Sequence, residues 1–207
     1  MSRLVSRKSL LMSLGVIALL AAMVFGGVAS AQARPLNLDG VRTQLTLEPA
    51  TAGALLGLGV IPLPVWPTPV VPTADSLKYS FPVTGGRVDS KTLVGNIRHS
   101  GGLLLAKADI GGWKSLKLTH YTITIKATGA YITATVNGGP RVKILTLDLT
   151  SAAITKYMKH HRSFVKIANV GATLTDAATA AINTTFGSML PNGIKLGTAV
   201  VLLRVAR

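Results

Sequence analysis

The stretch YSFPVTGGRVDSKTLVGNIRHSGGLLL, residues 79–105, decides the fold class that we expect for this chain. Apolar and polar residues alternate along most of it, which is typical of β-strands with one buried face. Glycine pairs at 85–86 and 101–102 interrupt the alternation and predict turns. We therefore predict strands at residues 77–83 and 92–98 and a third that begins at Leu103.

The same pattern continues on both sides of this stretch. Pro49 and Gly187 are placed where a helix begins and where one ends, and they predict short helices at 49–57 and 176–186. Glycine turns between successive strands indicate an antiparallel meander. The predicted fold is all-β, an antiparallel two-sheet β-sandwich with two short helices. The further strands that we expect cover residues 44–47, 116–127, 130–136, 141–149, 163–170 and 195–205.

Two local patterns add detail to this sandwich. Residues 60–73, VIPLPVWPTPVVPT, contain five prolines and predict an edge strand or an extended belt over the core, because proline removes backbone N–H donors. Trp66 lies in this segment and is expected to be a packed anchor rather than a ligand stacker. Residues 44–52 resemble residues 173–180, which indicates either two similar strand-to-helix corners or coincidence in Ala/Thr-rich sequence.

The first 33 residues have the pattern of a cleaved signal peptide. Three basic residues precede an uncharged run of nineteen, residues 9–27, and small-x-small cleavage sites follow at Ala31 and Ala33. An uncleaved membrane anchor is the alternative, since the run is just long enough to span a bilayer. We favour cleavage, which leaves a single domain at 34–207 with no stable transmembrane span, secreted or extracellular and associated with the cell wall.

The sequence is strongly basic and has no cysteine. Without the three basic residues of the signal peptide, 22 − 3 leaves 19 Lys and Arg against 7 Asp and Glu, a net charge of +12. This charge favours anionic cell-wall polymers as partners, although it is equally consistent with a role in solubility alone. Nucleic acid is not expected, because the basic residues are scattered and aromatic residues make up only 5% of the chain.

No complete catalytic set is visible, and we predict that the protein is not an enzyme. A triad of Ser100, His99 and Asp89 is disfavoured, because adjacent residues on a strand point to opposite faces. His160 and His161, with His120, form the one candidate metal cluster. Neighbouring histidines in a lysine-rich segment are more often a solvated surface, so we predict no metal site.

His99 is the candidate ligand-binding residue. Glycines flank it in GNIRHSGGL, residues 95–103, and we expect them to let a flat ligand approach the backbone. An imidazole at the edge of a turn is a suitable axial ligand for haem iron. From the chemistry of the residues alone, we favour the simpler interpretation, a histidine that hydrogen-bonds a strand end.

A resemblance to a known family sharpens this expectation. The runs SFPVTGGRV and GNIRHSGGL, with the closing TLTDAATAAINTTFG and GIKLGTAV, resemble the HtaA-type haem-binding domains of secreted actinobacterial surface proteins and related uncharacterised exported proteins. The resemblance covers about residues 42–203. It implies a two-sheet β domain at the cell envelope, with haem as the candidate ligand and His99 matching the family's histidine. The family's iron-binding tyrosine follows the Ser-Phe pair, whereas Tyr79 precedes it here.

We therefore expect a secreted or cell-envelope-associated, non-enzymatic binding protein, with haem as its candidate cofactor and His99 in contact with it. The alternative is a structural or adhesive envelope protein that binds anionic wall polymers and has no small-molecule ligand.

Overall fold

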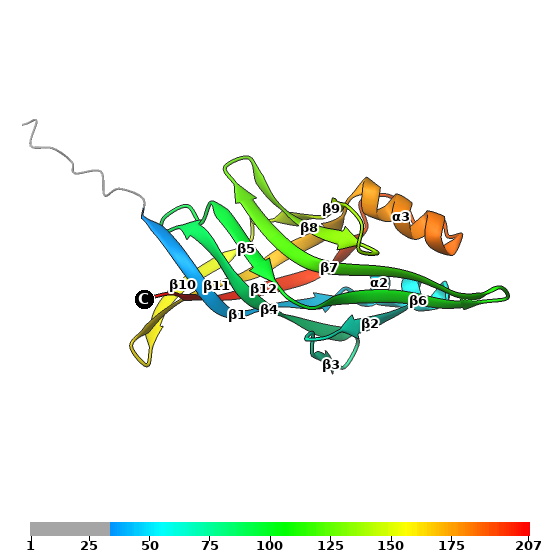
Figure 1. The fold of residues 1–207 in the computed structure, drawn as a ribbon, viewed down its shortest axis with the longest axis horizontal. Coiled ribbons are helices and arrows are strands. Elements are labelled where there is room, and N and C mark those ends of the chain that lie inside the picture. Colours follow the sequence, from blue (N-terminus) through cyan, green and yellow to red (C-terminus); the bar gives the residue numbers. More distant parts are fainter. Residues whose placement is uncertain (1–33) are drawn as a thin grey trace, which may run out of the picture. The chain divides into compact units, whose positions relative to one another are not determined.

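The computed structural model describes residues 34–207, and the predicted signal peptide lies outside these residues. Twelve strands and two helices follow one another along this part of the chain (Figure 1). They are β1 (Pro35–Leu47), α2 (Pro49–Gly57), β2 (Ile61–Val65), β3 (Val70–Pro72), β4 (Leu77–Asp89), β5 (Gly95–His99), β6 (Gly102–Asp109), β7 (Gly112–Lys126), β8 (Gly129–Val136), β9 (Arg141–Asp148), β10 (Ala153–Lys159), β11 (Arg162–Leu174), α3 (Asp176–Phe186) and β12 (Lys195–Val205).

Eight of these strands close into an antiparallel β-barrel. Their order is β7-β5-β4-β1-β12-β11-β9-β8, and β8 pairs again with β7 to complete the ring. The prediction of a two-sheet sandwich is therefore wrong, although the all-β class and the two short helices are confirmed. Alternation of apolar and polar residues is the same along the strands of a sandwich and of a barrel, so it does not reveal whether the last strand pairs with the first.

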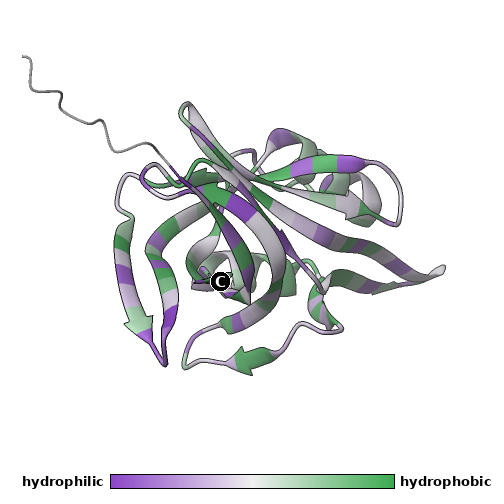
Figure 2. Ribbon diagram, turned by 60° about the vertical axis from the view of Figure 1, so that its left-hand side comes forward, coloured by the Kyte–Doolittle hydropathy of each residue, from purple (hydrophilic) through white to green (hydrophobic). Residues whose placement is uncertain are grey.

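The core fills the interior of this barrel. Hydrophobic and hydrophilic residues alternate along the strands, so that one face of each strand is buried (Figure 2). β1 and β11 lie on either side of β12, have nearly the same burial pattern, and are each followed by a helix. The similarity between residues 44–52 and 173–180 therefore corresponds to two equivalent strand-to-helix corners.

The glycine pair at 85–86 does not form a turn. β4 runs through both residues to Asp89, with a register shift between Val83 and Gly85 where it pairs with β5. A Cβ atom on Gly86 would collide with the backbone oxygen of Asn96, and one on Gly95 would collide with the backbone oxygen of Arg87. Gly86 and Gly95 therefore allow β4 and β5 to approach closely.

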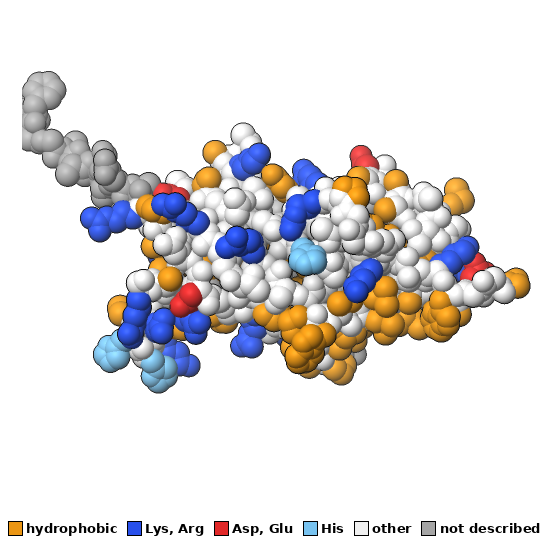
Figure 3. Space-filling model, in the orientation of Figure 1, with side chains coloured by type: hydrophobic (Ala, Val, Ile, Leu, Met, Phe, Trp, Pro, Cys, Tyr) orange, Lys and Arg blue, Asp and Glu red, His pale blue; other side chains and the backbone are white. Residues whose placement is uncertain are grey.

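The proline-rich segment forms edge strands, as predicted. β2 pairs with β6, and β3 pairs with the beginning of β4. Tyr79 is fully buried beneath this segment and donates a hydrogen bond from its hydroxyl to the carbonyl oxygen of Pro62 at 2.7 Å. Trp66 does not anchor the segment, since 91% of its side chain is exposed, and hydrophobic side chains gather on the surface over β2 and β3 (Figure 3).

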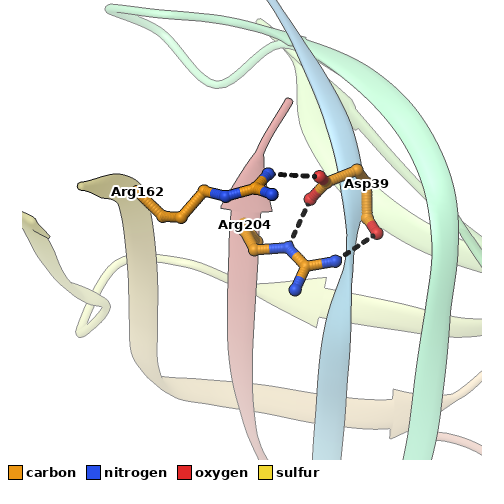
Figure 4. A network of polar contacts seen from close by, with 3 residues as sticks. All are labelled: Asp39, Arg162 and Arg204. Atoms are coloured by element: carbon orange, nitrogen blue, oxygen red, sulfur yellow. Dashed lines mark hydrogen bonds and ion pairs between the residues drawn. The ribbon is translucent and has the colours of Figure 1, made fainter. Parts of the chain in front are cut away.

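Long-range polar contacts tie three strands of the barrel together. Asp39 on β1 accepts hydrogen bonds from Arg204 Nε on β12 at 2.6 Å and from Arg162 Nη1 on β11 at 3.2 Å (Figure 4). The Nη2 atom of Arg204 also donates to the backbone oxygen of Asp39 at 3.1 Å. Both guanidinium groups are therefore paired with one carboxylate.

The two helices are short and locally encoded. Pro49 begins α2, while the hydroxyl of Thr175 accepts a hydrogen bond from the backbone N–H of Ala178 and caps α3. Gly187 ends α3 with a left-handed backbone, φ 63°. Neither helix of residues 34–207 is long and apolar enough to cross a membrane.

Candidate ligand-binding site

An apolar cavity of about 210 Å³ lies inside the barrel. Side chains from β1, β4, β5, β6, β7, β8, β9, β11 and β12 line it, and Ala177, Ala178, Ala181 and Ile182 of α3 cover it from one side. Most of the lining is aliphatic. Its polar side chains are three, Thr43, His99 and Tyr121.

His99 is the last residue of β5 and points into the barrel. Only 5% of it is exposed, and its Nε2 atom lies 2.7 Å from Oγ1 of Thr43, which is itself buried on β1. The Nδ1 atom is buried and makes no hydrogen bond of ordinary geometry. His99 therefore hydrogen-bonds β1 through Nε2, while Nδ1 has no partner at hydrogen-bonding geometry, although the backbone of Tyr121 and Ile97 lies near the ring.

Burial controls the charge of His99. Removal of the ring from water lowers its pKa from 6.5 to about 4, and the backbone of Tyr121 and Ile97 opposes part of this effect. The imidazole is therefore neutral at pH 7. A neutral imidazole carries one N–H and one lone pair, so Nδ1 offers either a buried donor or a buried acceptor.

Tyr121 on β7 is the second polar group of the cavity that lacks a partner. Its ring packs edge-on against Phe81, with centroids 5.0 Å apart. Its buried hydroxyl makes no hydrogen bond of ordinary geometry, although the backbone of Leu103 lies close enough to oppose part of the effect of burial on its pKa. Burial raises the pKa of this phenol well above its usual value. The position of Tyr121 depends on a register shift between β7 and β8 at Thr119–Thr122, where His120 has a positive φ of 54°.

We did not predict Tyr121 from the sequence, although a signal was present. Leu116 and Leu118 are apolar at even positions of β7, whereas Tyr121, Ile123 and Ile125 are apolar at odd positions. When the apolar residues of one strand switch from even to odd positions, a β-bulge is indicated. The first apolar residue after the switch, here Tyr121, then points into the core because of the bulge.

The other candidate residues lie elsewhere. Asp89 ends β4, and its Oδ1 accepts hydrogen bonds from the backbone N–H groups of Lys91 and Thr92, which lower its pKa. His160 and His161 form the exposed turn between β10 and β11, whereas the ring of His120 contacts threonine hydroxyls on β7 and β8. Within residues 34–207, no three His, Asp or Glu side chains gather as a metal site would require.

A closed eight-stranded barrel with an internal cavity defines the class of this protein, a β-barrel able to enclose one small ligand. No model of a known protein family matches the chain, and neither does any curated protein.

Two solved structures share the fold. The C-terminal domain of HtaA from Corynebacterium glutamicum has a TM-score of 0.55 at 12% identity, over 83% of this chain and 99% of that domain. The haem-binding protein HtaB from the same organism has a TM-score of 0.50 at 10% identity, over 84% of this chain and 97% of HtaB. The resemblance to HtaA-type domains is therefore confirmed at the level of the fold.

The residues around His99 do not fit haem as they stand. Pockets that take drug-sized ligands measure about 300–1,000 Å³, and a porphyrin is at least as large as such ligands. The cavity of about 210 Å³ is smaller, and none of its lining residues is a cation that could pair with a propionate. The hydroxyl of Tyr79 donates its hydrogen bond to the carbonyl oxygen of Pro62. Burial also raises the pKa of both Tyr79 and Tyr121, which opposes formation of a phenolate ligand.

Proposed function

We propose that this chain is an exported, non-enzymatic binding protein that holds a small apolar molecule with one hydrogen-bonding group inside its barrel. The observation that carries the proposal is the cavity of about 210 Å³, whose lining includes His99 and Tyr121, two of the three residues in 34–207 with a buried polar side-chain atom that makes no hydrogen bond. Buried polar groups without partners are rare in proteins, and a bound ligand is one explanation for them.

The size of the cavity sets the class of ligand. An engineered apolar cavity of about 150 Å³ stays dry and binds benzene, so a cavity of this kind favours a substituted single ring or a short aliphatic chain. One hydroxyl, amide or carbonyl on the ligand would satisfy Nδ1 of His99 or the hydroxyl of Tyr121. His99 would then contact the ligand through that group.

A titration with p-cresol and toluene tests the proposal. Both molecules have the same ring and methyl group, and only p-cresol carries a hydroxyl. We expect both to bind in calorimetry and p-cresol to bind about tenfold more tightly, because a hydrogen bond to a buried group contributes about 1 kcal/mol or more.

Three variants of α3 test the position of the site, two that fill the cavity and one matched control. Ala178→Leu should fill the cavity and abolish binding, with Ala181→Leu as a second cavity-filling variant. Ala180 lies on the exposed face of the same helix, so the Ala180→Leu variant should bind both ligands normally. Equal binding by all three variants, or no binding of either ligand to the unmodified protein, would refute the proposal.

Haem is the second candidate ligand. The observation that favours it is the fold shared with HtaB, a haem-binding protein. Its binding here would require the barrel to open, because the cavity is too small. Titration with haemin decides between the two: a saturable, red-shifted Soret band that is lost in His99→Ala supports haem, and the spectrum of free haemin excludes it.

A further inference from the structure

The outer face of the barrel carries a second hollow that the internal cavity does not explain. It is an open groove of about 660 Å³ across β4, β5, β7 and β8, with one further residue each from β1 and β9. Figure 3 shows Lys and Arg side chains spaced over the face formed by β5, β7 and β8. The groove is lined by Asn37, Gly86, Arg87, Asn96, Arg98, Thr122, Thr124, Tyr131, Thr133 and Arg141.

Three guanidinium groups in this groove have no counter-charge. None of the residues that line it is acidic, and no ion pair in residues 34–207 involves Arg87, Arg98 or Arg141. Arg162 and Arg204, by contrast, share the carboxylate of Asp39. Arg162 and Arg204 thus tie strands together through a carboxylate, whereas the three arginines of the groove have no acidic partner.

Strand register brings two of these arginines close together. Arg87 on β4 is opposite Asn96 on β5, and Arg98 lies two residues further along β5, opposite Gly85. Such diagonal positions are about 7–8 Å apart, a separation at which unpaired like charges repel. Nη2 of Arg98 lies 3.4 Å from the position of a Cβ atom on Gly85, so the absence of a side chain there leaves room for the guanidinium.

The third arginine is held in place. Arg141 Nη1 donates to the hydroxyls of Thr122 and Thr133 at 3.1 and 3.0 Å, and its Nη2 donates to the backbone oxygen of His120 at 2.6 Å. No acceptor within residues 34–207 is recorded for its Nε–H. A fixed guanidinium with a free donor loses less entropy when it binds an oxyanion.

We propose that this groove binds a chain polymer of phosphate esters with a polyol backbone. Guanidinium groups bind phosphate oxygens through paired hydrogen bonds, and several of them along one groove favour a chain over a single ion. The asparagine amides and threonine hydroxyls between the arginines suit the hydroxyls of a polyol.

The same groove is poorly suited to two other polyanions. Bases of a nucleic acid would need an aromatic platform, and the one aromatic ring here, Tyr131, has Lys126 and Lys143 beside it, 5.7 and 5.1 Å from the ring centroid. Stable binding to a bilayer needs apolar side chains that insert among the lipids, and none of the residues that line the groove is an exposed large apolar residue.

Calorimetry with a synthetic poly(glycerol phosphate) oligomer tests the proposal. We expect the oligomer to bind at least about tenfold more tightly than glycerol 3-phosphate. Arg87→Gln/Arg98→Gln should weaken binding about tenfold or more, because it removes two charge-assisted contacts. Arg42→Gln/Lys166→Gln removes the same charge from exposed sites outside the groove and should change affinity less than about twofold.

Three results would overturn the proposal. Equal losses in the two double variants would mean that net charge alone attracts the oligomer. Binding of glycerol 3-phosphate as tight as that of the oligomer would exclude a chain polymer. Binding only to oligo(dT), or only to vesicles of phosphatidylglycerol and phosphatidylcholine, would assign the groove to a nucleic acid or to a membrane.

Discussion

Acid should destabilise the folded protein through His99. Burial lowers the pKa of His99 to about 4 in the folded protein, whereas the exposed ring of the unfolded chain has a pKa of 6.5. Between these two pH values the unfolded chain binds a proton that the folded protein does not. The stabilisation is therefore fully present above pH 6.5 and is lost as the pH falls toward 4. A difference of about 2.5 pKa units corresponds to about 3 kcal/mol at most.

Urea unfolding measures this loss directly. Between about pH 7.5 and about pH 5, linkage with these two pKa values predicts a fall of about 2 kcal/mol in the free energy of unfolding. Hydrogen bonds lower the pKa of Asp89, Asp109 and Asp148 below the usual 3.8, so these carboxylates remain ionised throughout this interval.

Two variants isolate the histidine. His99→Gln should lose the pH dependence over this interval, and His120→Gln, at an exposed position, should retain it. If the unmodified protein has the same free energy of unfolding at both pH values, or if His99→Gln still shows the full loss, the assignment of a buried neutral imidazole is wrong.

Two further pairs of substitutions test the packing. Tyr79→Phe should cost about 1–2 kcal/mol in urea unfolding, because it leaves the buried carbonyl of Pro62 unpaired, whereas Tyr121→Phe removes a hydroxyl without a partner and should be neutral or stabilising. If Tyr79→Phe and Tyr121→Phe changed the free energy of unfolding equally, the two hydroxyls would not differ in hydrogen bonding as described. Gly86→Ala should cost about 2–4 kcal/mol, because its Cβ would collide with backbone and its φ is +147°. Gly53→Ala, in the helix α2 with open space around it, should instead stabilise the protein by about 0.5–1 kcal/mol, and a neutral Gly86→Ala would contradict the close approach of β4 and β5.

Local sequence patterns were sufficient for much of the secondary structure. The strands at 116–127, 130–136 and 195–205 and the helices at 49–57 and 176–186 depend on alternation and capping, which act over a few residues, and the structure contains all of them. The prediction of a turn at Gly85–Gly86 is wrong, because glycine is favoured both in turns and where two strands approach closely.

Barrel closure and the cavity depend on contacts that no local pattern records. The contact of His99 with Thr43 spans 56 residues. The pairing of β1 with β12 joins the first and last strands of residues 34–207, so it forms only after the strands between them have wound round the core. Local alternation does place Arg98 and His99, adjacent residues of β5, on opposite faces of the strand. It did not show that the outer one borders a groove.

Nitrogen chemical shifts of the histidine rings, measured while p-cresol is added, test the central claim most directly. We expect His99 to remain neutral at about pH 5.5, because its pKa is about 4. We also expect its Nδ1 resonance to move when p-cresol is added. Resonances of His120, His160 and His161 should stay in place, and His99→Gln identifies the moving signal by its loss. A His99 ring that is protonated at this pH, or whose Nδ1 resonance ignores saturating p-cresol, would contradict a ligand site inside the barrel.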